Sequence, residues 1–124
     1  MSGYLDHGQW RTGWYDTARS GGDFVRAASG YRHWVSADDA SQFPAQPGRY
    51  HLYVSLACPW AHRTLIVRKL KALEDVVSLS IVDPVMHEDG WAFSDARGCI
   101  PDSVNHQAFL RDVYLLADPG IADA

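Results

Sequence analysis

One cysteine stands where the chain could hold a reactive thiolate. Cys58 lies between residues 50–56, which are typical of a strand, and a run of helical period that begins at Pro59. Proline is well accommodated in the first turn of a helix, so Cys58 is predicted to cap that helix at its N-terminus. Unpaired N–H groups and partial positive charge at a helix N-terminus favour thiolate over thiol, and nearby Arg63 would help. We therefore predict that Cys58 is a nucleophile; the alternative is a buried cysteine that only fills space.

The residue three positions after Cys58 decides which thiol chemistry is open to it. A dithiol oxidoreductase carries a second cysteine there, which resolves the mixed disulfide, but this chain has Ala61. Cys58 can therefore form a mixed disulfide and needs an external thiol to clear it. The other cysteine of the chain, Cys99, has no spacing that supports a resolving role.

The segments around Cys58 predict a βαβ unit. Residues 50–56 and 76–83 are rich in β-branched and aromatic residues, as expected of strands. Between them, the apolar residues that follow the helical period are Ala61, Leu65, Ile66, Leu70 and Leu73. The two strands should be parallel and joined by a right-handed crossover.

The segments that flank this unit are less regular. Residues 84–103 predict a loop that holds Trp91 and Cys99, and residues 105–117 predict a helix capped by Asn105. The predicted apolar face of that helix consists of Phe109, Leu110, Val113, Leu116 and Ala117. Residues 1–49 show no sustained period but many aromatic side chains, which predicts an extended arm that packs against the rest.

Composition excludes several classes of function. The chain has 124 residues, 47% of them apolar and 21% charged, with a net charge of −4, as expected of a folding globular protein. It shows no apolar run long enough for a membrane span, no signal-peptide pattern and no basic stripe, which predicts neither a membrane nor a nucleic-acid partner. Its six histidines lack ligand spacing, so no metal is expected. Two cysteines without a disulfide framework predict a reducing, cytoplasmic compartment.

Several motifs together carry a family resemblance. Residues 53–64, YVSLACPWAHRT, resemble the active-site segment of the glutathionyl-hydroquinone reductases, the Xi class of the glutathione transferase superfamily. Cys-Pro-x-x alone is shared with glutaredoxins and omega-type transferases, but Cys-Pro-Trp-Ala is more specific. Further matching segments are 14–17, 21–22, 24–26 and 31–34 in the arm, Gly90-Trp91-Ala92-Phe93 in the loop, and 113–115 and 117–119 in the last helix.

The resemblance implies an α/β, thioredoxin-like fold, that of the glutathione transferase N-terminal domain. Residues 1–49 would form the arm, and residues 50–124 would form the first βαβα part of the glutathione-binding domain. Cys58 would be the catalytic residue, glutathione the co-substrate and S-glutathionyl-hydroquinones the substrates, in a homodimer for the full-length family. Trp91 would line the glutathione site, although a hydrophobic plug under the loop is its simpler role.

The resemblance also implies that part of the family's fold is absent. Family members continue into a Thr-Val-Pro-Val segment and a helical domain, neither of which this sequence contains. We therefore expect a truncated chain with a bare edge on the strand before Cys58, prone to aggregate and with little turnover. Two other functions stay open: an omega-type thiol transferase acting on dehydroascorbate or mixed disulfides, and a non-catalytic remnant or interaction module.

Overall fold

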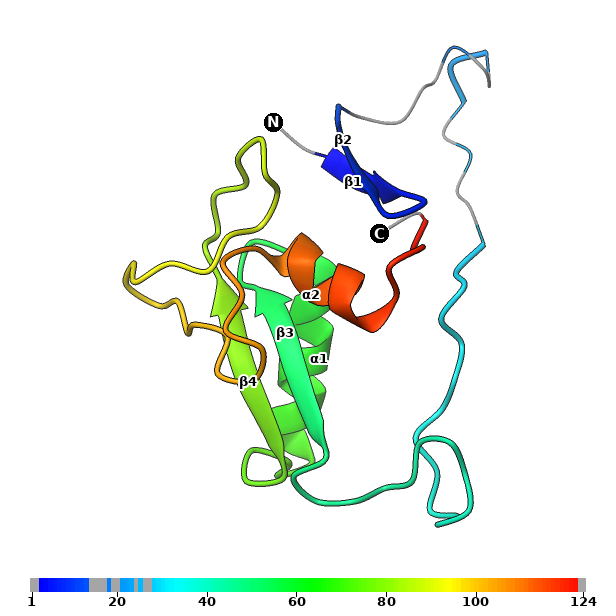
Figure 1. The fold of residues 1–124 in the computed structure, drawn as a ribbon. Helices are drawn as coiled ribbons and strands as arrows, with labels where there is room; N and C mark the ends of the chain where they lie inside the picture. Colours follow the sequence, from blue (N-terminus) through cyan, green and yellow to red (C-terminus); the bar gives the residue numbers. More distant parts are fainter. Residues whose placement is uncertain (1–2, 14–17, 19–20, 24, 26–27, 123–124) are drawn as a thin grey trace.

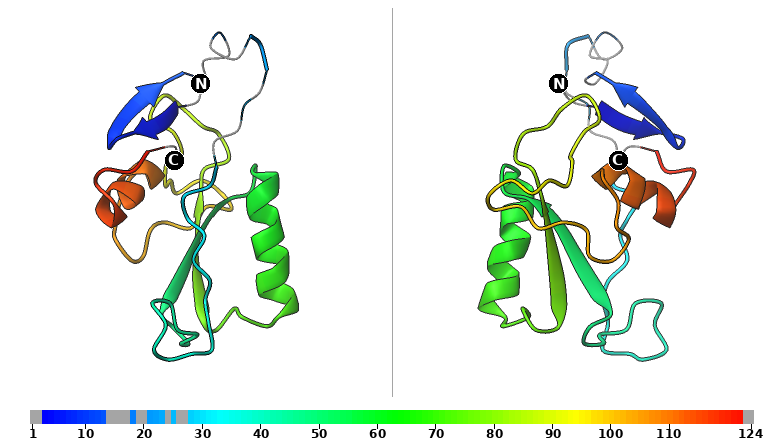
Figure 2. Two further views of the ribbon diagram at one scale, coloured as in Figure 1. Left: turned by 90° about the vertical axis from the view of Figure 1, so that its right-hand side faces the viewer. Right: turned by 60° about the vertical axis from the view of Figure 1, so that its left-hand side comes forward.

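A parallel strand pair with one helix on each face forms the centre of the molecule (Figure 1). The computed structural model describes residues 3–13, 18, 21–23, 25 and 28–122. Strands β3 (Tyr50–Ser55) and β4 (Val77–Val82) pair in parallel register from Tyr50↔Val77 to Ser55↔Val82. Helix α1 (Pro59–Leu70) connects them and lies on one face, and helix α2 (Leu110–Ala117) lies on the other (Figure 2). The predicted βαβ unit is confirmed.

Helix α1 turns only part of its apolar surface to the sheet. Ala61, Leu65 and Arg68 are half-buried, and the Arg68 Nε donates a hydrogen bond of 2.8 Å to the Val77 carbonyl at the start of β4. Ile66 and Leu70 are 47% and 78% exposed, because the helix rotates them away from the row that faces the sheet. The helical period of these two residues is confirmed, but within the described residues they do not pack on the sheet.

The strand that precedes Cys58 has one free edge. In the described part of the chain, β3 pairs with β4 and with no further strand. This agrees with the bare edge expected from the sequence. The core beneath it is small: Val54 and Val82 are buried, together with the Ser80 hydroxyl, which donates a hydrogen bond to the Pro101 carbonyl.

The second helix is shorter than predicted, because a buried carboxylate holds the chain that precedes it. Asp102 is 3% exposed and accepts hydrogen bonds from the backbone N–H groups of Val104, Asn105 and Gln107 at 3.0–3.2 Å. These contacts fold residues 102–107 into a tight turn, so the helix begins at Leu110, with Phe109 as its N-cap residue. The predictions of a helix over 105–117 and of Asn105 as its cap are therefore wrong.

The arm contains a hairpin that was not predicted. Strands β1 (Gly3–Asp6) and β2 (Gln9–Thr12) pair antiparallel across a two-residue turn at His7 and Gly8, both with positive φ. Beyond the hairpin, residues 28–49 run along the molecule to the start of β3 (Figure 1). The arm motifs at 14–17 and 24–26 lie largely outside the described residues, as do Trp14, Tyr15 and Phe24.

One histidine on the sheet makes the stability depend on pH. His51 contacts the hydroxyl oxygens of Ser78 and Ser80 at 2.6 and 2.8 Å, and burial, partly opposed by the charge of Asp102, lowers its pKa below the ordinary 6.5. A group whose pKa is lower in the folded chain than in the unfolded chain stabilises the fold at pH values above its unfolded-state pKa. That stability is lost as the pH falls through its folded-state pKa.

We therefore expect the free energy of unfolding to fall as the pH drops below about 6.5, and His51→Gln to reduce that slope. Urea titrations of the unmodified chain and of His51→Gln between about pH 8 and pH 5 measure this pH dependence of the unfolding free energy. His33→Gln is the matched control, since no hydrogen bond of the His33 ring is formed within the described residues. An unchanged slope in His51→Gln would contradict the assignment.

Candidate functional site

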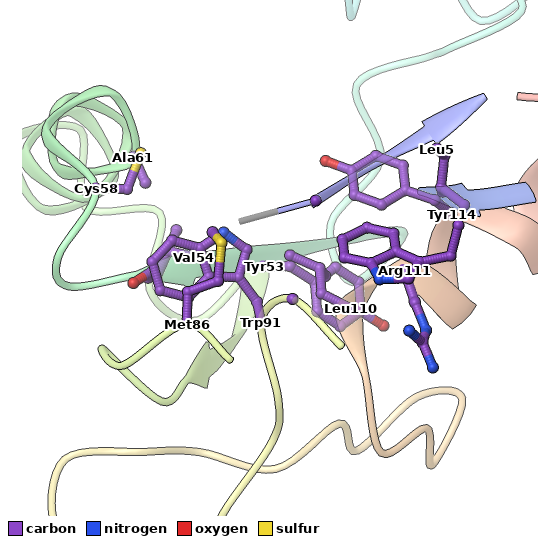
Figure 3. Close-up of a pocket in the computed structure, with 14 residues that line it drawn as sticks. Leu5, Tyr53, Val54, Cys58, Ala61, Met86, Trp91, Leu110, Arg111 and Tyr114 are labelled. Carbon is purple, nitrogen blue, oxygen red and sulfur yellow. The ribbon is translucent and has the colours of Figure 1, made fainter. Parts of the chain in front are cut away.

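A cavity of about 260 Å³ lies at the carboxyl ends of β3 and β4, and Figure 3 shows residues that line it. Parallel strands commonly present ligand sites at their carboxyl ends. Four elements supply its walls: the end of β3 with the start of α1, the loop after β4, helix α2 and the β1–β2 hairpin. Cys58, Ala61, Trp91 and Tyr114 all line it, so the structure brings both residues of the predicted site, Cys58 and Trp91, to one cavity.

Cys58 occupies the predicted position at the N-terminus of α1. It is the N-cap residue, with extended backbone (φ −92°, ψ 113°), and Pro59 begins the helix. Its side chain makes no capping hydrogen bond, its carbonyl accepts the His62 N–H at 3.1 Å, and its thiol is free and half-buried. The thiol can therefore react with a molecule in the cavity. The Arg63 guanidinium lies over the Trp60 ring, 5.1 Å from its centroid.

The second cysteine is not at this site. Cys99 lies in the loop after β4 and does not line the cavity, and the Ser94 hydroxyl lies 3.5 Å from its sulfur. Ala61, three residues after Cys58, lines the cavity where a dithiol enzyme would carry its resolving cysteine. The cavity as described thus offers a single thiol.

Trp91 is held by backbone pairing to helix α2. Its carbonyl accepts the Leu110 N–H at 2.9 Å, the Phe93 N–H donates to the Ala108 carbonyl at 2.8 Å, and Ala92 bridges Phe109. This short antiparallel pairing fixes the loop against the first residue of α2. The half-buried Trp91 side chain is thereby positioned in the cavity with Met86 and Cys58 (Figure 3).

The hairpin closes the cavity through Trp10. The Trp10 indole N–H donates a hydrogen bond of 2.8 Å to the Glu88 carbonyl in the loop that carries Trp91. The Arg111 guanidinium lies 5.3 Å from the Trp10 ring centroid and forms an ion pair of 2.8 Å with Asp89. The buried Leu5 of β1 also lines the cavity, so a segment far away in the sequence completes its wall.

Gly90 is required by this packing. Its φ is +81°, and a Cβ there would lie 2.8 Å from the Trp10 ring. Gly90→Ala is therefore expected to lower the free energy of unfolding by about 2–3 kcal/mol, from backbone strain and displacement of the ring.

Urea unfolding of Gly90→Ala, compared with Gly98→Ala, checks this expectation. Gly98 has a similar φ of +91° but open space around its missing Cβ, so only the backbone cost of about 1 kcal/mol is expected there. Equal losses in the two variants would show that Trp10 does not constrain Gly90.

Two tyrosines line the cavity, and their hydroxyl groups differ in hydrogen bonding. The Tyr53 hydroxyl donates a hydrogen bond of 2.8 Å to Asp102 and accepts one of 3.0 Å from the Asn105 amide. Burial, followed by the hydrogen bond to Asp102, raises the pKa of Tyr53 to about 12. Tyr114 lies on α2, and burial, followed by the charge of Cys58, raises its pKa. In Figure 3 the Tyr114 ring extends from α2 into the cavity with its hydroxyl toward the side of Cys58.

Sequence reasoning missed Trp10, Arg111 and Tyr114 as cavity residues. A signal for the hairpin was present, since His7-Gly8 separates two short segments and both turn residues can adopt positive φ. No comparable signal marks Arg111 or Tyr114, because both depend on where α2 packs.

Two features are absent from the described residues. No helix there combines the length and apolar character needed to cross a membrane. Within the same residues, no three His, Cys, Asp or Glu side chains gather as a metal site would require.

Comparisons with known proteins agree with the architecture. No family model matches the chain. It is 52% identical to the glutathionyl-hydroquinone reductase YqjG of Escherichia coli, over 94% of this chain and 38% of that protein. It is 43% identical to the glutathione S-transferase omega-like 2 of Schizosaccharomyces pombe, over 84% of this chain and 33% of that protein.

Solved structures give the same relationship. A Xi-class transferase from Natrialba magadii superposes with a TM-score of 0.83 at 43% identity, over 98% of this chain and 36% of that one. The glutathione-bound structure of YqjG superposes with a TM-score of 0.70 at 48% identity, over 76% of this chain and 33% of that one. The predicted α/β, thioredoxin-like fold class is confirmed, and the chain spans about 38% of the length of its E. coli relative. The chain is thus a partial relative of the glutathionyl-hydroquinone reductases and of the Xi-class glutathione transferases.

Proposed function

We propose that Cys58 is the single catalytic thiol of a glutathione-dependent reductase that acts on S-glutathionyl-hydroquinones. The observation that carries the proposal is the placement of one free thiol, at the N-terminus of α1, in an aromatic-lined cavity where Ala61 replaces a resolving cysteine. The name of the E. coli relative and its glutathione-bound structure support the choice of glutathione and of the substrate class.

The reaction follows from the single thiol. The Cys58 thiolate attacks the glutathionyl sulfur of the substrate and forms a disulfide with it. The bond between that sulfur and the aromatic carbon breaks, and the carbon receives the electron pair and a proton, which releases the hydroquinone. A second glutathione, as thiolate, then attacks the mixed disulfide and leaves as glutathione disulfide, so that Cys58 is restored.

Trp91 is proposed to contact glutathione. It lies in the same cavity as Cys58, and its backbone is fixed by the Leu110 N–H. A preorganised aromatic wall beside the thiol would hold the glutathionyl group in the orientation that attack at sulfur requires. Trp91→Ala should therefore weaken the binding of the glutathionyl substrate more than it alters the reactivity of Cys58.

The wider organisation is part of the same proposal. Residues 1–49 form the arm, and residues 50–124 form part of the thioredoxin-like glutathione-binding domain. The whole protein would act as a homodimer in the cytoplasm, where a reducing environment keeps Cys58 and Cys99 as thiols.

An omega-type thiol transferase is the second candidate, supported by the 43% identity to the S. pombe omega-like protein. The test is to supply the whole protein with glutathione and either an S-glutathionyl-hydroquinone or dehydroascorbate, and to measure hydroquinone release and dehydroascorbate reduction. Release of hydroquinone with little reduction of dehydroascorbate supports the proposed function. The opposite preference would favour the omega-type activity, and the absence of both would favour a non-catalytic module.

A further inference from the structure

A proton must reach the departing aromatic carbon, and Cys58 cannot supply it. Cys58 reacts as a thiolate and has no proton to give. Unlike a thiolate leaving group, a carbon leaving group must be protonated when the bond to sulfur breaks. A proton donor that faces Cys58 across the cavity would meet this need.

Of the two tyrosines that line the cavity, only Tyr114 has a hydroxyl available for this role. The Tyr53 hydroxyl already donates its proton to Asp102 at 2.8 Å. Within the described residues, the Tyr114 hydroxyl forms no hydrogen bond, and its side chain, 43% exposed, is open to the cavity. Figure 3 shows its ring reaching from α2 toward the side of the cavity that holds Cys58.

The electrostatics keep Tyr114 protonated beside the thiolate. Burial, followed by the charge of Cys58, raises the pKa of Tyr114, so its phenol holds its proton at neutral pH. A phenol is a weak acid in water, but a carbon that takes up a bonding electron pair is a far stronger base than phenolate. The transfer therefore runs from the Tyr114 oxygen to the carbon.

We propose that Tyr114 is the catalytic proton donor to the aromatic carbon of the S-glutathionyl-hydroquinone, a role that rests on the proposed function. As Cys58 forms the disulfide bond to the glutathionyl sulfur and the sulfur–carbon bond breaks, the Tyr114 proton passes to the carbon. The resulting phenolate takes the thiol proton of the second glutathione. That glutathione, now a thiolate, attacks the mixed disulfide and regenerates both residues.

The test compares two substrates under single-turnover conditions with the chain in excess. An S-glutathionyl-hydroquinone requires protonation at carbon, whereas glutathione disulfide reacts with Cys58 to release a glutathione thiolate and requires none. Quenched-flow measurement of the Cys58–glutathione disulfide gives the rate with each substrate. Tyr114→Phe keeps the ring and removes only the hydroxyl.

Tyr114→Phe is expected to slow the reaction with the S-glutathionyl-hydroquinone on the order of 100-fold and to leave the rate with glutathione disulfide within about twofold. Tyr31→Phe is the matched control, since Tyr31 contacts Asp118 after the end of α2 and does not line the cavity. It should leave both rates unchanged.

Two results would overturn the inference alone. One is a Tyr114→Phe rate equal to that of the unmodified chain with the aryl substrate, and the other is an equal loss with both substrates, which would indicate a structural role. Failure of the proposed function looks different: the unmodified chain would react with glutathione disulfide and not with the S-glutathionyl-hydroquinone.

Discussion

Under the proposed function, Cys58→Ser in the whole protein is expected to abolish the release of hydroquinone from an S-glutathionyl-hydroquinone, reducing the rate to that of the uncatalysed reaction. The serine hydroxyl stays protonated at neutral pH and cannot form a disulfide, so both half-reactions are lost. Cys99→Ser is the matched control and should retain the full rate, because Cys99 lies in the loop after β4, outside the cavity. Chromatographic measurement of hydroquinone and glutathione disulfide follows the two products.

The pair of variants separates a one-thiol mechanism from a two-thiol mechanism. If Cys99 resolved the mixed disulfide, Cys99→Ser would accumulate the glutathionylated chain and lose turnover. Equal losses in the two variants would therefore contradict the assignment of Cys58 as the only participating thiol.

Asp102→Ala is expected to lower the free energy of unfolding by about 3 kcal/mol, the largest effect on stability that we predict. The substitution removes the acceptor of the Tyr53 hydroxyl and of three backbone N–H groups, at Val104, Asn105 and Gln107. These hydrogen bonds are part-buried, and a donor that keeps no acceptor there has lost some of the water it bound in the unfolded chain. The exposed Asp95 is the control, and Asp95→Ala should change stability by less than about 0.5 kcal/mol.

The pH dependence gives this prediction a second measurement. Burial opposes ionisation of Asp102, but the hydrogen bonds from Asn105, Gln107, Tyr53 and Val104 outweigh it and lower its pKa below the ordinary 3.8. Its contribution to stability is thus present above about pH 4 and is lost as the pH falls through the folded value. The difference in unfolding free energy between the unmodified chain and Asp102→Ala should shrink as the pH falls below about 4, and a constant difference would contradict an ionic role.

The βαβ unit and its reactive end could be predicted because local signals determine them. Residues 50–56 and the helical period after Pro59 both have clear boundaries, and the structure places Cys58 at the N-cap as expected. The same reasoning failed for residues 105–109, where the helical pattern was outweighed by the hydrogen bonds to Asp102. Those bonds depend on burial, which the sequence pattern does not show.

The walls of the cavity were beyond sequence reasoning for a similar reason. Leu5 and Trp10 are separated from Trp91 by about eighty residues, and tertiary contacts such as the Trp10 hydrogen bond to the Glu88 carbonyl bring them together. Ile66 and Leu70 show a related limit, since helical period alone does not tell which apolar positions of α1 face the sheet.

The most direct test of the account is the covalent product of one half-reaction. The purified chain is mixed with one equivalent of an S-glutathionyl-hydroquinone and no free glutathione, and mass spectrometry of the intact chain and its peptides identifies the adduct. We predict one glutathionyl group on Cys58, with an equal amount of hydroquinone released, because the thiolate attacks sulfur. An aryl group on Cys58 with glutathione released, or a glutathionyl group on Cys99 instead, would contradict the mechanism.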